Sequence, residues 1–108
     1  MIPQAVPALC RALAADLRDV GYEAEALRSA WGDAADDAIA RGLRSPAARA
    51  LGSRADALAV LARLLMLGMP QPAAAVDGAL TRTGALGLSR LGLAEQDGDD
   101  VQPTERGP

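Results

Sequence analysis

The chain has 108 residues, half of them apolar, so one small domain with one hydrophobic core is expected. Histidine is absent and Cys10 is the only cysteine, which excludes an internal disulfide and a Ser–His or Cys–His catalytic pair and argues against a zinc site. The net charge is −3, and residues 93–108 hold five acids and one arginine, so the sequence lacks the basic stripe typical of nucleic-acid-binding proteins.

A long amphipathic helix is predicted first. Apolar residues recur at helical spacing through residues 6–20, Pro7 suits the first turn, and Gly21 suits the C-terminal stop. The pattern places Cys10 on the apolar face as a buried thiol and Asp16 on the opposite, polar face.

Three shorter helices are predicted next. Residues 22–31 begin with acids that complement the helix dipole, and Trp31 is expected to anchor this helix in the core. A fourth helix starts at Ser45, with serine as N-cap and proline in the first helical position. The third helix lies between them over residues 33–43, and its inward-facing residues are predicted to be Ala35, Ile39 and Leu43.

A central helix is predicted to follow Ser53, which forms a near capping box with Asp56. This helix is apolar on nearly every face, with Arg63 as the interruption, until glycine and proline end it at Gly68 and Pro70. A helix of this kind is normally covered on several sides.

The C-terminal half reads as a winged helix. A short helix over residues 71–80 and a turn precede a last helix over residues 85–91, and two strands over residues 93–96 and 100–103 flank an Asp-Gly turn. The acidic stretch at this turn lacks the spacing of a calcium loop and is interpreted as a solvated hairpin tip.

The predicted fold is therefore mainly α: N-terminal helices (residues 5–52) packed on a winged-helix-like unit (residues 53–103) with a small C-terminal β-hairpin. Each half is too small for a good core alone, so residues 1–104 are expected to form a single compact domain, with residues 105–108 as a frayed tail.

One functional interpretation is a DNA-binding regulator. The last helix would then enter the major groove, and the residues available for nucleic-acid contact are Arg82, Ser89 and Arg90. Base readout normally uses Arg, Lys, Asn or Gln, and Asn and Lys are missing from the whole chain. The acidic hairpin also works against phosphate binding, so nucleic acid is the disfavoured partner.

A second interpretation comes from a resemblance. The strings "LAADLRDVGYEAEAL", "SPAARAL", "ALAVLARLLMLGMPQPAAAVDGAL" and "GLSRLGLAEQDGDDV", in this order across residues 9–101, resemble the N-terminal domain of a family of actinobacterial methyltransferases. In that family a helical, winged-helix-like domain precedes a class I catalytic domain. The catalytic domain binds S-adenosylmethionine through a glycine-rich loop and carries an Asn-Pro-Pro-Tyr type motif.

The resemblance implies a non-catalytic accessory or substrate-positioning domain whose partner is a methyltransferase catalytic domain, in cis or in trans. The present sequence contains neither the Asn-Pro-Pro-Tyr motif nor the cofactor loop, so no catalytic, cofactor-binding or metal-ligating residue is assigned to it. S-adenosylmethionine is expected only for a full-length family member, of which this chain would be a fragment or a stand-alone relative.

The sequence also bears on location. Its N-terminus lacks the basic stretch and long apolar run of a signal peptide. The longest apolar run, residues 57–69, contains Arg63 and is too short to span a bilayer, so a cytoplasmic protein without a membrane partner is expected.

Overall fold

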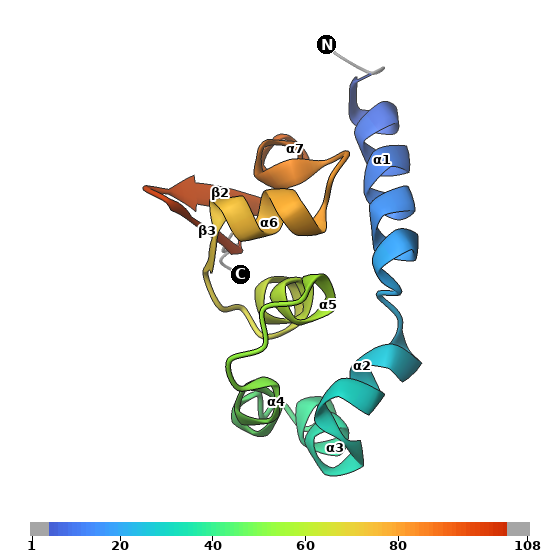
Figure 1. The fold of residues 1–108 in the computed structure, drawn as a ribbon, viewed down its shortest axis with the longest axis vertical. Coiled ribbons are helices and arrows are strands. Elements are labelled where there is room, and N and C mark those ends of the chain that lie inside the picture. The colour runs from blue at the N-terminus through green and yellow to red at the C-terminus, as the bar shows by residue number, and fades with distance from the viewer. Residues whose placement is uncertain (1–4, 104–108) are drawn as a thin grey trace.

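The computed structural model describes residues 5–103 and confirms a mainly helical fold with a small sheet near the C-terminus. Helices α2–α4 gather at one end of the molecule, and α6 (Ala73–Ala79), α7 (Gly84–Arg90) and the sheet gather at the other (Figure 1). Helix α5 (Ala57–Leu61) lies between these two groups, and the long helix α1 runs along one side. The N-terminal helical bounds are α1 (Ala5–Val20), α2 (Ala24–Trp31), α3 (Asp33–Ala40) and α4 (Ser45–Leu51).

Helices α2, α3 and α4 agree with the sequence except at two positions. Trp31 is buried, as predicted, and its indole N–H donates to Asp36 over 3.2 Å. The prediction for Leu43 is wrong: α3 ends at Ala40, and the leucine side chain beyond it is 55% exposed. Helix α4 includes Ser45 itself, so the N-cap position falls on Arg44, one residue earlier than predicted.

The central helix changes type along its length. It begins as α5 (Ala57–Leu61) and continues as the π-helix η1 (Ala62–Met66). Asp56 is its N-cap and accepts a hydrogen bond from the Ala59 N–H, so the predicted capping role of Ser53 is wrong. Arg63 is buried, and its guanidinium donates to the Gly52 carbonyl over 3.0 Å, at the C-terminal end of α4.

The C-terminal half has the winged-helix order. Strand β1 (Gln71–Pro72), α6 (Ala73–Ala79) and α7 (Gly84–Arg90) precede the hairpin of β2 (Ala94–Asp97) and β3 (Asp100–Pro103). The sequence did not predict β1, because two residues show no alternation and one of them is proline. β1 pairs antiparallel with β3, which gives a three-stranded sheet of order β1-β3-β2.

The core consists of two apolar clusters on either side of the central helix. Leu61 and Leu64 pack with α6, α7 and the sheet, whereas Ala59, Ala62 and Leu67 pack with α2, α3 and α4. The half-buried Tyr22 contacts both clusters. The helix is therefore covered on two sides, as its apolar surface predicts.

Helix α1 reaches the winged-helix unit at a glycine of α7. A Cβ at Gly87 would lie 2.6 Å from Cγ2 of Thr83 and 3.4 Å from Cδ2 of Leu9. The missing side chain thus makes room both for the preceding turn and for a leucine of α1.

Substitution of this glycine is expected to destabilise the protein. Alanine normally stabilises a helix relative to glycine by about 1 kcal/mol, but at Gly87 the clash should reverse the sign and lower the free energy of unfolding by about 1–2 kcal/mol. Gly78 in α6 is the matched control, because a Cβ there meets nothing within 4 Å. Urea unfolding should show Gly78→Ala as stabilising and Gly87→Ala as destabilising; equal stabilisation by both would contradict the close packing.

Candidate functional site

The helix-turn-helix of α6 and α7 is where a winged helix would meet DNA. Its turn is held by Asp77, whose carboxylate accepts a hydrogen bond from the Ala85 N–H over 2.9 Å. Gly84 adopts φ 64°, and a Cβ there would lie 2.9 Å from the same carboxylate oxygen. The N-terminal end of α7 therefore carries its own negative charge where a phosphate would otherwise bind.

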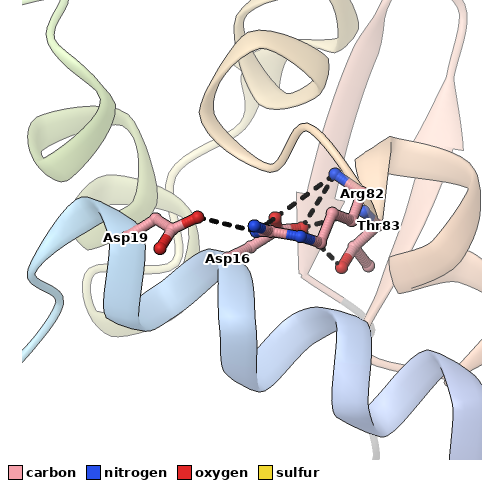
Figure 2. Close-up of polar contacts among 4 residues, drawn as sticks. All are labelled: Asp16, Asp19, Arg82 and Thr83. Carbon is pink, nitrogen blue, oxygen red and sulfur yellow. Dashed lines mark hydrogen bonds and ion pairs between the residues drawn. The ribbon is translucent and has the colours of Figure 1, made fainter.

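Arg82, the first residue predicted for nucleic-acid contact, is already paired. Its Nη1 lies 2.8 Å from Oδ1 of Asp16 and 2.8 Å from Oδ2 of Asp19, both on α1 (Figure 2). The hydrogen bonds that Arg82 donates to the two carboxylates raise its pKa, with Asp19 contributing most and Asp16 second. The guanidinium is thus part of the contact between α1 and the helix-turn-helix.

Asp16 is the centre of this polar cluster, and its predicted exposure is wrong. The side chain is 1% exposed and accepts hydrogen bonds from the backbone N–H groups of Arg82 and Thr83, from the Thr83 hydroxyl and from the Arg82 guanidinium (Figure 2). The two Thr83 bonds and the guanidinium bond each measure 2.8 Å. Burial raises the pKa of Asp16, but these hydrogen bonds outweigh burial and hold the pKa below its ordinary value of 3.8.

The sequence does contain a signal for this burial. Asp16 lies three residues after Leu13 and four before Val20, so it falls on the same stripe of the helix as these apolar residues. The stripe packs against the winged-helix unit, because Leu13 and Val20 contact its apolar cluster. Periodicity could therefore have placed the carboxylate inward, although its partners 66 and 67 residues away could not be read from it.

Ser89 and Arg90, the other two residues predicted for nucleic-acid contact, are exposed near the C-terminal end of α7. Arg90 takes part in none of the ion pairs recorded within residues 5–103. Leu86, which lies three residues before Ser89, is 62% exposed. The structure therefore leaves one free arginine on this helix, beside an exposed leucine.

The hairpin is acidic and solvated, as predicted. Asp97 and Asp100 lie directly opposite each other in the register of β2 and β3, and like charges so placed repel. The exposed acids of the hairpin are Glu95, Asp97, Asp99 and Asp100. The wing thus repels the phosphate backbone that wings of DNA-binding proteins contact.

An apolar groove lies between α1 and the end of α7. Its volume is about 400 Å³, and its lining residues are Cys10, Leu13, Ala14, Leu17, Leu91 and Leu93. Leu93 is 46% exposed at its edge. Cys10 is exposed, so its predicted burial is wrong: the apolar face of α1 is wider than the strip that the core covers.

Residues 19–104 match a family described as a domain of unknown function (DUF7059). The chain belongs to the DUF7059 family. The match runs from the last turn of α1 through the hairpin, so the DUF7059 domain includes both α2–α4 and the winged-helix-like unit. No curated protein and no solved structure matches the chain.

A second groove of the DUF7059 domain lies beside the π-helix, with a volume of about 610 Å³. Arg44, Glu95 and Gln102 supply its charged and polar groups, and Leu65 and Met66 of η1 form part of its wall. π-helical turns are frequent at functional sites, but the opposite charges of arginine and glutamate here select no one class of ligand.

Metal ligands do not cluster in the part of the chain that the structure describes: residues 5–103 hold no group of three or more Cys, Asp or Glu side chains placed to bind an ion. Over the same residues no helix is both long and apolar enough to cross a membrane.

Proposed function

We propose that the chain is a non-catalytic accessory domain that works with a class I, S-adenosylmethionine-dependent methyltransferase and binds protein rather than duplex DNA. The observation that carries this proposal is the recognition helix α7. Its exposed side chains include Leu86, and the arginine just before it, Arg82, is neutralised by Asp16 and Asp19. Helix α7 thus offers an apolar side chain where a DNA-reading helix would present the cations and amide groups that read bases and phosphates.

The charge of the surface supports the same choice. A DNA-binding winged helix gains most of its affinity from cations on phosphates, and affinity falls with each cation lost. Helix α7 contains one arginine, Arg90, which makes no ion pair within residues 5–103. The hairpin that follows carries four exposed acids, so the net charge of this surface is negative. A basic surface on the partner would meet this hairpin more favourably than a nucleic acid would.

The methyltransferase part of the proposal rests on the resemblance of the sequence. The cofactor belongs to the catalytic domain of that family, so the DUF7059 domain would position the substrate or the catalytic domain and leave methyl transfer to its partner. Calorimetric titration of the isolated chain with S-adenosylmethionine is then expected to give no binding heat.

The test uses the class I methyltransferase domain encoded in the same or an adjacent reading frame. We expect the two to co-purify, and Leu86→Asp to weaken the complex, because it places a charge in the contact face. Leu43→Asp is the matched control, since this leucine is similarly exposed but follows α3 at the other end of the molecule.

Two results would contradict the proposal. One is a complex that Leu86→Asp and Leu43→Asp affect equally. The other is salt-sensitive binding of duplex DNA that is lost when Arg82 and Arg90 are replaced by alanine, which would instead establish the DNA-binding alternative.

A further inference from the structure

The apolar groove has an edge of unpaired arginines. On α1, Arg11 and Arg18 lie three and four residues from Ala14, which lines the groove, so both adjoin it on the helix surface. On α7, Arg90 directly precedes the lining residue Leu91. All three arginines are exposed, and none takes part in an ion pair recorded within residues 5–103.

The floor of the groove is different from its edge. It is made of leucine, alanine and cysteine side chains. The two carboxylates of α1, Asp16 and Asp19, instead contact Arg82. An apolar floor gives a nucleic acid little to bind, because its affinity comes from phosphate contacts. The side chains of an amphipathic helix, by contrast, bury apolar surface in a groove of this kind.

We propose that this groove binds an amphipathic helix of a partner protein, with an apolar stripe on the floor and acidic residues against Arg11, Arg18 and Arg90. The charge of the edge selects acidic flanks over basic ones. The inference shares with the proposed function only the premise that the domain binds protein, and it does not require the partner to be a methyltransferase.

Cys10 makes the inference testable on the intact chain. It is the only cysteine in the sequence, it is exposed, and it lines the groove, so its alkylation rate reports on what occupies that groove. The probes are three synthetic peptides: a helix with a leucine stripe and glutamate flanks, the same helix with lysine flanks, and a glutamate peptide with scrambled leucines. At ten times its Kd, the striped glutamate peptide is expected to slow alkylation about tenfold. The other two peptides should leave the rate unchanged.

Variants locate the effect. Ala14→Glu should abolish protection by filling and charging the groove, whereas Ala50→Glu, at an exposed position of α4, should preserve it. The pair Arg11→Glu and Arg18→Glu should shift the preference toward the lysine peptide, and the control pair Arg41→Glu and Arg49→Glu should not. Circular dichroism confirms that each variant is folded before the rates are compared.

The result that would overturn the inference is the absence of protection by the striped glutamate peptide on folded protein. Protection by duplex DNA, or equal protection by all three peptides, would overturn it as well. The proposed function is tested separately, because that experiment measures binding to a methyltransferase domain and the effect of Leu86→Asp on this binding.

Discussion

Leu61→Asp is expected to unfold the whole chain. Leu61 is fully buried in the apolar cluster that joins the central helix to α6, α7 and the sheet. Loss of the leucine side chain costs about 2–5 kcal/mol, and desolvation of an unpaired carboxylate adds several more. A small domain has a free energy of unfolding of only about 5–15 kcal/mol, so the variant should populate the unfolded state in water.

The same substitution at Leu43 provides the comparison. Leu43 is largely exposed, so Leu43→Asp should change the unfolding midpoint little. Far-ultraviolet circular dichroism should therefore show lost helicity in one variant and native helicity in the other. Because residues of the central helix pack in both apolar clusters, loss of structure should extend to α2–α4 and should change the fluorescence of Trp31. A native Trp31 signal in Leu61→Asp would show instead that the two halves fold independently.

The fold was largely accessible from the sequence because its helices have strong local signals. The stop at Gly32, the proline start of α4 and the Asp-Gly pair of the hairpin act within a few residues, and helices or strands begin or end at each. The hairpin turn itself is Gly98-Asp99, one residue later than predicted, because Asp97 belongs to β2. The features that escaped prediction depend on residues distant in the chain. Strand β1 exists through its pairing with β3, and the apolar pattern of the sequence continues unchanged where α5 gives way to η1.

In the candidate site too, features set by neighbouring residues were predictable, and contacts between distant residues were not. Arg82 lies just before α7, and Ser89 and Arg90 lie within it, as their place in the chain implies, whereas their predicted contact with nucleic acid stays a prediction. Asp16, one of the two carboxylates that neutralise Arg82, lies 66 residues away on α1, and only the folded chain brings them together. The apolar groove likewise forms between α1 and residues 91 and 93, so the sequence could indicate its leucines but not their common surface.

Asp16→Asn should be the second strongly destabilising change. The asparagine amide would place donor hydrogens against the N–H and guanidinium donors that now bind the carboxylate. The buried Thr83 groups and the Arg82 groups would then lack a full acceptor. Breaking a buried, hydrogen-bonded charge of this kind costs about 3 kcal/mol. Urea unfolding at neutral pH measures this loss. Asp19→Asn is the control: its side chain is mostly exposed and meets the same guanidinium, so its removal should have a small effect.

The cost of Asp16→Asn should also depend on pH, with a sign that follows from the pKa. The folded protein holds the pKa of Asp16 below its ordinary value of 3.8, so the carboxylate stabilises the fold fully above that value, and the contribution is lost as pH falls through the folded-state pKa. The hydrogen bond from Arg54 lowers the pKa of Asp56 as well, but this residue is present in both proteins and cancels in their difference. The difference in free energy of unfolding between wild type and Asp16→Asn should therefore be constant above about pH 5 and shrink in acid, where wild-type Asp16 is itself protonated. A difference that stays constant from neutral pH into acid would show that Asp16 stabilises the contact between α1 and the helix-turn-helix by shape and not by charge.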